Sequence, residues 1–164
     1  MSDLHQAFLS LGSNIEPVKN LVKAIELLQK YGKLEKISNA WESESVGAEG
    51  PNYLNACVLL VTPLGQLELK ERALLPIETE LGRQRSADKF APRTIDIDIV
   101  LFNDKFMNGK YWEQAFVVIP LAEIHPEYQN PLTGESIIQT ATRLRQQVWM
   151  ETRSEVLSRF HRSS

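Results

Sequence analysis

Residues 94–102 read TIDIDIVLF, in which apolar and polar side chains alternate over the first part of the stretch. Successive side chains of a β-strand point to opposite faces of the sheet. The stretch therefore predicts a strand with its isoleucines in the core and with Asp96 and Asp98 together on the opposite face. The apolar face of such a strand has to be covered by a second layer, so the rest of the chain must supply neighbouring strands and helices.

The segments before this strand predict alternating strands and helices. Short apolar runs bounded by turn residues are typical of strands, and apolar residues three or four apart are typical of helices. The expected elements are strands at residues 8–11, 34–42 and 53–62 and helices at residues 17–31 and 65–81. The second helix is expected to turn Leu67 inward and to kink at Pro76. A turn is expected at residues 12–14, which read Gly-Ser-Asn.

The segments after the strand predict smaller elements. The expected order is a turn at residues 103–104, a ragged hairpin at 105–118, a short helix opening at Pro120, a helix at 137–145, and a surface tail or helix at 146–164. The order strand, helix, strand, strand, helix, strand is that of a ferredoxin-like α+β unit. We therefore expect a single domain over residues 1–164. Its antiparallel sheet has helices packed on it and is extended by a hairpin and C-terminal helices.

Composition narrows the class of protein. The chain has 164 residues, of which 43% are hydrophobic, and this is enough to bury one core. Its formal charge of -3 gives no global attraction for nucleic acid or for an anionic membrane. Long apolar runs of membrane-spanning length are lacking, and the single cysteine, Cys57, fits a reducing compartment. We expect a cytoplasmic protein with small-molecule partners, with no nucleic acid, membrane or obligate protein partner.

Asp96 and Asp98 are the candidate metal ligands. Residues two apart on a strand lie roughly 6.5 to 7 Å apart, so two carboxylates at this spacing can jointly hold hard cations that carry phosphates. A basic loop lies directly upstream, with Arg83, Arg85 and Arg93 as candidate phosphate ligands. From spacing alone two plainer interpretations stay open. The strand can be amphipathic with two aspartates on its polar face, and the loop can be a solvated segment with surface salt bridges.

Tyr53 and Asn55 are the candidate ligands for a flat heterocycle. They alternate on the strand at residues 53–62, so they share a face. Tyrosine offers a stacking surface and asparagine offers an amide edge. An ordinary strand face remains the alternative. The Gly-Ser-Asn sequence at residues 12–14 lacks the Gly-Lys-Ser/Thr of a Walker A phosphate loop and is interpreted as a structural turn.

Taken together, these segments resemble the 6-hydroxymethyl-7,8-dihydropterin pyrophosphokinase family. The matching motifs are LSLGSN at residues 9–14, PNYLNA at 51–56, IE-x-x-LGR-x-R at 77–85, APRTIDIDIVLF at 91–102 and PLAEI at 120–124. They occur in the family's order, and the PRTIDID block is the most specific. The resemblance implies transfer of the terminal diphosphate of ATP to the hydroxymethyl oxygen of the pterin, with release of AMP. It implies ATP as co-substrate and two Mg²⁺ ions.

The resemblance also implies a role for each matching residue. Asp96 and Asp98 hold the magnesium ions, and Arg83 and Arg93 act as catalytic residues on the phosphates. ATP is bound by Glu78, Arg85, Phe90 and Ile99. The pterin is bound by Ser43, Val46, Tyr53, Asn55 and Phe116. Phe90 stands where the family usually has tryptophan.

The chain departs from the family pattern in residues 103–115, where the family carries a Pro-His pair and a further arginine. This segment contains no histidine, proline or arginine, although Lys105, Lys110 and Trp112 are candidates to replace them. Three functions therefore remain open. The chain is the enzyme, or a pterin- or nucleotide-binding relative with weak or lost transfer activity, or a nucleic-acid-binding module. The acidic composition and the lack of an RNA-binding aromatic motif disfavour the third.

Overall fold

The computed structural model describes residues 3–45, 50–82 and 94–161. In this part of the chain a 7-stranded antiparallel sheet has the order β6-β5-β1-β4-β3-β7, with β2 also paired to β4. The strands are β1 His5–Ser13, β2 Lys33–Ile37, β3 Ala40–Ser43, β4 Tyr53–Thr62, β5 Asp96–Phe102, β6 Lys105–Phe106 and β7 Met150–Arg153. The central order β5-β1-β4 with β2 and β3 outside it is the ferredoxin-like arrangement that the sequence predicts.

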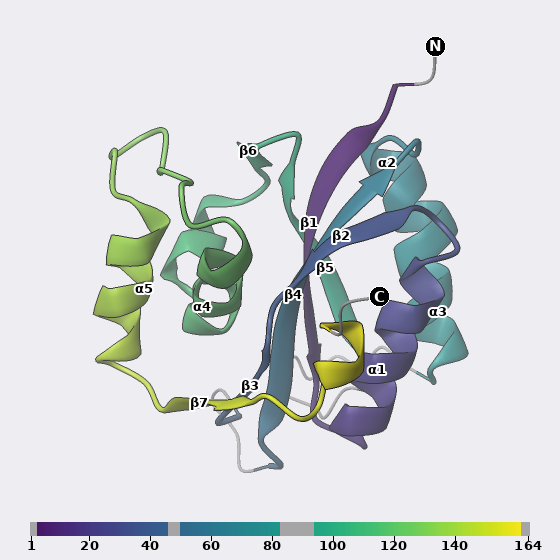
Figure 1. Ribbon diagram of the computed structural model, residues 1–164, viewed down its shortest axis with the longest axis horizontal. Coiled ribbons are helices and arrows are strands. Elements are labelled where there is room, and N and C mark those ends of the chain that lie inside the picture. Colours follow the sequence, from purple (N-terminus) through teal and green to yellow (C-terminus); the bar gives the residue numbers. More distant parts are fainter. Residues whose placement is uncertain (1–2, 46–49, 83–93, 162–164) are drawn as a thin grey trace.

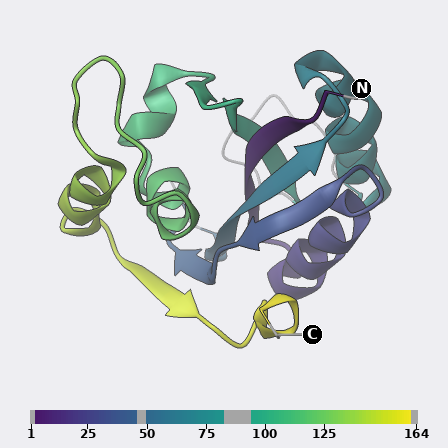
Figure 2. The same cartoon turned by 45° about the horizontal axis from the view of Figure 1, so that its top comes forward.

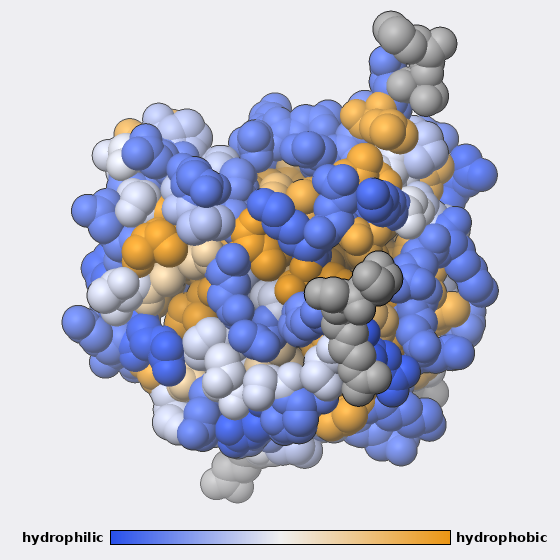
Figure 3. Space-filling view, viewed as in Figure 1, coloured by the Kyte–Doolittle hydropathy of each residue, from blue (hydrophilic) through white to orange (hydrophobic). Residues whose placement is uncertain are grey.

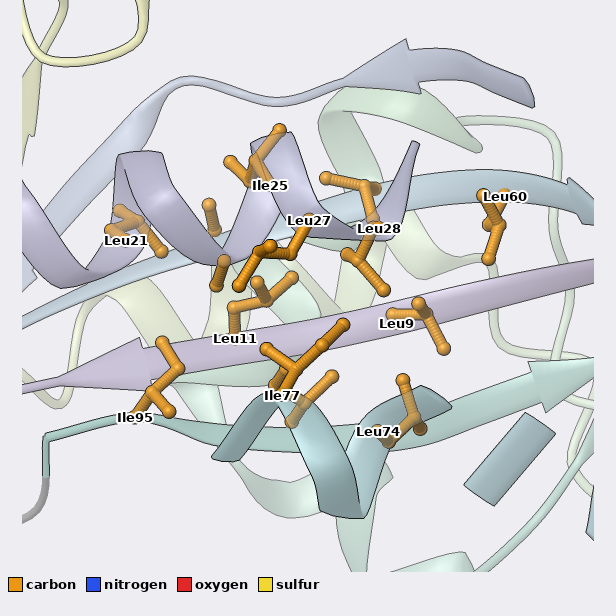
Figure 4. Close-up of a cluster of buried hydrophobic side chains, with 14 of the residues drawn as sticks. Leu9, Leu11, Leu21, Ile25, Leu27, Leu28, Leu60, Leu74, Ile77 and Ile95 are labelled. Atoms are coloured by element: carbon orange, nitrogen blue, oxygen red, sulfur yellow. The ribbon is translucent and has the colours of Figure 1, made fainter. Parts of the chain in front are cut away.

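Helices cover both faces of the sheet (Figures 1 and 2). One face packs against α1, Pro17–Leu28, and the composite helix α2, η1 and α3. The other packs against α4, Ala115–Ile124, with α5, Ile137–Arg145, outside it. Strand alternation divides the core accordingly. Leu9 and Leu11 face α1 and α3, as Figure 4 shows, whereas Phe8 and Cys57 face α4.

Strand β1 is longer than the sequence predicts. The expected turn at residues 12–14 is wrong for Gly12 and Ser13, which continue the strand. Gly12 pairs with Asn55 of β4 on one side and with Asp96 of β5 on the other. Residues that look like a turn in isolation become strand here because two neighbours satisfy their backbone groups.

Strand β5 presents its side chains as predicted. Ile95 and Ile97 are buried in the core on the α1 side, while Asp96 and Asp98 are half-buried on the α4 side. A bulge opposite Phe8 and Leu9 interrupts the alternation further along, and Val100 and Leu101 both enter the core under α4. Asn103 and Asp104 then turn the chain into β6 with φ values of 50° and 64°, as a two-residue hairpin turn requires.

The predicted helix at residues 65–81 is composite. It consists of α2, Gln66–Leu69, a π-helical turn η1, Lys70–Leu74, and α3, Leu75–Glu80. A π-turn inserts one extra residue and rotates the helix face. This rotation explains why Leu67, expected to point inward, is 67% exposed while Leu69 is fully buried. The turn directly precedes Pro76, whose missing N–H breaks the regular helical ladder.

Three other expectations are corrected. The single strand expected at residues 34–42 divides into β2 and β3, because Ser38 turns its side chain to the Asn39 carbonyl and the Cys57 N–H. The expected hairpin at 105–118 is a short β6, a 3-10 turn η2, Gly109–Glu113, and the start of α4, with Pro120 inside that helix. The tail from Gln146 supplies edge strand β7 and the 3-10 turn η3, Ser158–Phe160, in place of a surface helix.

The remaining helices and the surface complete the picture. Helix α5 covers the residues predicted for it, and Ser136 begins it with a capping box in which Gln139 reciprocates. Among the described residues, no helix has both the length and the apolar character needed to cross a membrane. On the face shown in Figure 3, hydrophilic residues form most of the outline and apolar residues show between them.

Candidate active site

Two adjoining cavities meet at strand β5. We call the first the sheet cavity; its volume is about 340 Å³, and it is lined by Tyr53 and Asn55 of β4, Ser43 of β3 and Gly12 of β1. We call the second the helix cavity; its volume is about 410 Å³, and it is lined by Lys70, Leu74, Leu75 and Glu78. Both volumes fall within the roughly 300 to 1,000 Å³ typical of small-molecule sites.

The two cavities share one wall. The residues that line both are Asp96, Asp98, Lys110, Gln114 and Phe116. Strand β5 supplies the two aspartates, η2 and the residue after it supply the lysine and the glutamine, and α4 supplies the phenylalanine. A molecule in either cavity therefore reaches the same pair of carboxylates.

Asn55 is held in one orientation at the floor of the sheet cavity. Its amide Nδ2 donates to the Trp41 carbonyl at 3.1 Å and to Ser43 Oγ at 2.7 Å. Both donors are thus committed to strand β3, and the side chain is buried. The cross-strand register that pairs Trp41 with Asn55 and Ser43 with Tyr53 produces this arrangement. The amide edge predicted from sequence is present, and its carbonyl oxygen is the atom left to meet a ligand.

Gly12 provides room beside that amide. A Cβ built at Gly12 would lie 3.3 Å from Asn55 Oδ1 and 3.7 Å from Tyr53 Cδ1. Any side chain at this position would therefore project against the two predicted pterin ligands. Gly12 was interpreted from sequence as part of a turn, and its place in the cavity wall was missed because strand pairing is a long-range property.

Asp96 and Asp98 lie opposite small residues of β1. Asp96 pairs with Gly12 and Asp98 with Ser10, so little side-chain volume covers them from that strand. The negative charges of both aspartates act on Tyr111, which lines the helix cavity. Burial, and then the negative charges of Asp98 and Asp96, raise the pKa of Tyr111 to about 12. The charges of both aspartates therefore reach a group in the helix cavity.

This donor set fits magnesium carried by phosphates. Among the described residues, no group of three or more His, Cys, Asp or Glu side chains is placed to hold a metal ion. Two carboxylates alone make an incomplete site for most metals. Mg²⁺, however, is typically bound by one or two carboxylates, and its remaining positions are filled by water and substrate phosphates.

Glu78 lines the helix cavity and is tied to strand β5. It is 4% exposed, and its Oε2 accepts a hydrogen bond from the Ile97 N–H at 2.8 Å. The carboxylate therefore ties α3 to the start of β5, next to the aspartates. Ile99 is another predicted ATP-binding residue. Its side chain is partly buried against the core on the α1 side and is not part of either cavity wall.

The segment from Lys110 to Gln114 contributes residues that sequence analysis did not assign. Tyr111 and Gln114 line the helix cavity, although no periodicity in a 3-10 turn marks them. Trp112, considered as a stacking surface, is buried in the α4 core and donates its indole N–H to Glu135 at 3.2 Å. Lys105 lines neither cavity, whereas Lys110 lines both. The predicted residues Val46, Arg83, Arg85, Phe90 and Arg93 lie outside the described residues.

Fold and site together define an α+β protein with two adjoining cavities that share a wall containing two aspartates. The comparisons with known proteins agree with this class. The family model described as 7,8-dihydro-6-hydroxymethylpterin-pyrophosphokinase matches residues 8–126. The chain belongs to this family.

Curated relatives match over most of their length. One is the 2-amino-4-hydroxy-6-hydroxymethyldihydropteridine pyrophosphokinase of Synechocystis, 38% identical over 82% of this chain and 74% of the relative. The protein of the same name from Bacillus subtilis is 33% identical over 84% of this chain and 89% of the relative. Both alignments cover more than two thirds of each partner.

Solved structures support the fold. The Plasmodium falciparum HPPK-DHPS A437G variant with pteroate superposes with a TM-score of 0.71 at 14% identity. The match covers 89% of this chain and 45% of the other, so this chain spans less than half of that protein. The α+β architecture predicted from sequence is confirmed by this likeness.

Proposed function

We propose that this protein transfers the terminal diphosphate of ATP to the hydroxymethyl oxygen of 6-hydroxymethyl-7,8-dihydropterin, giving AMP and the pterin diphosphate for folate biosynthesis. The single observation that carries the proposal is the acidic wall shared by the two cavities. Family membership supplies the substrate class, and the geometry supplies a place for each substrate.

The pterin is assigned to the sheet cavity. Tyr53 and Phe116 offer aromatic surfaces for the ring, and the fixed amide of Asn55 offers a polar edge. Ser43 acts chiefly through Asn55, because its hydroxyl accepts one of the amide hydrogens. Val46 remains a pterin-binding residue by its place in the family motif alone.

ATP is assigned to the helix cavity, with its phosphates directed to the shared wall. Glu78, which lines this cavity, stays assigned to ATP, and its carboxylate also fixes α3 against β5. Arg85 and Phe90 stay assigned to ATP, and Arg83 and Arg93 to the phosphates during transfer, through the motifs that contain them. Ile99 also stays assigned to ATP through its motif, and its side chain packs behind the strand.

Asp96 and Asp98 would hold the magnesium ions. Bound there, magnesium would supply positive charge next to the phosphates, where negative charge develops during phosphoryl transfer. The residues of the chain contribute by positioning the two substrates. Because both cavities adjoin one wall, the hydroxymethyl oxygen and the diphosphate are held next to each other. The encounter between two substrates thereby becomes a reaction within one complex.

The alternative of a relative without transfer activity is not favoured. Curated relatives of 32% to 38% identity carry the pyrophosphokinase name. The nucleic-acid-binding alternative has no support in the comparisons. A cytoplasmic location and the lack of an obligate partner stay predictions; relatives in Arabidopsis thaliana and Lactococcus lactis are named bifunctional proteins, so fused arrangements occur among them.

A direct assay tests the proposed function. The protein is mixed with ATP, magnesium and the reduced pterin, and AMP and pterin diphosphate are followed by chromatography. We expect AMP to form only when all three components are present. Equal release of AMP without the pterin, or no AMP at millimolar ATP, would contradict the proposal.

A further inference from the structure

Lys110 occupies a special position among the lysines near the two cavities. It lies in η2 and lines both the sheet cavity and the helix cavity. Lys70 lines the helix cavity alone, and Lys105 lines neither. Among the lysines that the structure describes, Lys110 is therefore the one that lies where the two cavities adjoin.

The backbone around Lys110 is fixed from both sides. Asn108 Oδ1 accepts a hydrogen bond from the Lys110 N–H at 3.0 Å, which caps the turn. Two residues later, Trp112 is buried in the core under α4, with its ring edge-on to Phe106 at 5.2 Å and its indole N–H bonded to Glu135. The turn is thus anchored while the lysine side chain itself is exposed.

The ammonium group has no committed partner in the described structure. None of the ion pairs or side-chain hydrogen bonds among residues 3–45, 50–82 and 94–161 engages Lys110 Nζ. An exposed lysine without a partner is common at a protein surface. Here, however, the lysine belongs to the same wall as two carboxylates, and this wall adjoins both cavities.

We propose that Lys110 is a phosphate-binding residue that contacts the diphosphate group both before and after its transfer. This inference rests on the proposed function. An ammonium is a compact point charge on a flexible stem, so it can follow a phosphate group that moves across the shared wall. Asp96 and Asp98 would hold the cations that accompany the phosphates, while Lys110, on the same wall, binds phosphate oxygens directly. The transferred group is thereby held between positive charges.

The test compares three matched substitutions, Lys110→Met, Lys70→Met and Lys105→Met. Methionine keeps an unbranched side chain and removes the charge. Calorimetric titration with magnesium pyrophosphate probes the diphosphate directly, and titration with magnesium and a non-hydrolysable ATP analogue probes the nucleotide. We expect Lys110→Met to weaken binding of both probes by about 10- to 100-fold, the effect of one charge-assisted hydrogen bond. Lys70→Met should weaken the analogue alone, and Lys105→Met should change neither.

Kinetics and a conservative variant separate charge from structure. Lys110→Met should also lower kcat in the diphosphate transfer assay, and Lys110→Arg should restore part of both the affinity and kcat. Unchanged circular dichroism and an unchanged melting temperature show that the turn is intact. The inference is overturned if Lys110→Met binds magnesium pyrophosphate as tightly as Lys105→Met does. This readout does not need turnover, so failure of the proposed function, seen as no AMP from the wild-type protein, is distinguished from failure of the Lys110 assignment.

Discussion

Asp96 and Asp98 contribute charge to the shared wall and little packing. Both are half-buried on the polar face of β5, while Ile95 and Ile97, which alternate with them, fill the core. Replacing either carboxylate by its amide therefore keeps shape and removes the ligand for a cation. Metal binding supplies several kcal/mol of transition-state stabilisation, so we expect Asp96→Asn and Asp98→Asn each to lower kcat by about 100-fold or more.

The measurement is the rate of AMP formation at saturating substrates, with circular dichroism and the urea midpoint as controls for the fold. Magnesium titration of activity should also require higher metal concentrations in both variants. Near-normal turnover in both, with an intact fold, would remove the aspartates from the metal site.

Gly12 determines the space available to a ring in the sheet cavity. Alanine here would place a methyl group 3.3 Å from Asn55 Oδ1, closer than most contacts of this kind. Strand geometry at this position tolerates alanine, so the cost should fall on the ligand more than on the fold. We expect Gly12→Ala to weaken pterin binding by about 10-fold or more while the affinity for the ATP analogue changes little. Equal losses for both ligands, or none for the pterin, would contradict this view of the cavity.

Several site residues were predictable because strand alternation is local. Asp96, Asp98, Tyr53 and Asn55 lie on the face that the two-residue period assigns to them. Gly12 was not predictable as a cavity residue, since its neighbours Asn55 and Asp96 are distant in sequence. The residues of η2 carry no period at all, so only the structure reveals which of them face the site.

Elements were predicted well where one signal dominated and poorly where two competed. Strand β4 has the predicted bounds because a long apolar, β-branched run is unambiguous. In the helix at residues 65–81 the sequence predicts one apolar face and a kink at Pro76, whereas the π-turn η1 changes which residues face inward. Pro120 was interpreted as the start of a helix, although the apolar residues before it already form the first turns of α4 against the sheet.

Glu135 links two elements that shape the site. Its carboxylate accepts hydrogen bonds from Arg143 at 2.8 Å, from Thr140 at 2.7 Å and from the Trp112 indole at 3.2 Å. It therefore joins α5 to η2, the turn that carries Lys110. The hydrogen bonds from Arg143, Thr140 and Trp112 lower the pKa of Glu135 from its ordinary 4.5 to about 2.

The lowered pKa predicts a specific acid sensitivity. A carboxyl group whose pKa is depressed by folding stabilises the native state above its unfolded pKa, and this contribution is lost as the pH falls through the folded value. For Glu135 the loss should run from about pH 4.5 down to about pH 2. We expect Glu135→Gln to be less stable than wild type at neutral pH and to lose less stability over this range.

Urea midpoints measured between pH 2 and pH 7, with Glu127→Gln as a matched control, check this prediction. Glu127 is exposed and makes no hydrogen bond or ion pair with the described residues, so its replacement should leave the pH profile unchanged. Parallel profiles for wild type and Glu135→Gln would show that the network does not contribute to stability.

At the scale of the molecule, the site lies where three layers meet. Strands β1, β4 and β5 form the floor, the composite helix supplies one wall from the far layer, and η2 with the start of α4 supplies another. Figure 1 shows these elements arranged around the sheet. No single layer contains the site. The sequence therefore predicts the layers one by one, whereas the shared wall is seen only in the assembled structure.

The shared wall predicts that the two substrates influence each other's binding. Phe116 lines both cavities, and so do Lys110 and Gln114, so a ligand in one cavity orders side chains that the second ligand contacts. The second ligand then has less side-chain entropy to lose, and its affinity rises. We expect the ATP analogue with magnesium to tighten pterin binding by about 5- to 150-fold, the usual range of coupling between sites.

Linkage requires the pterin to tighten binding of the analogue by the same factor, and calorimetric titrations in both orders measure this equality. Phe116→Ala should reduce the coupling as well as the pterin affinity, whereas Lys105→Ala should leave both unchanged. Pterin affinities that are equal with and without the analogue would mean that the two cavities act independently despite their common wall.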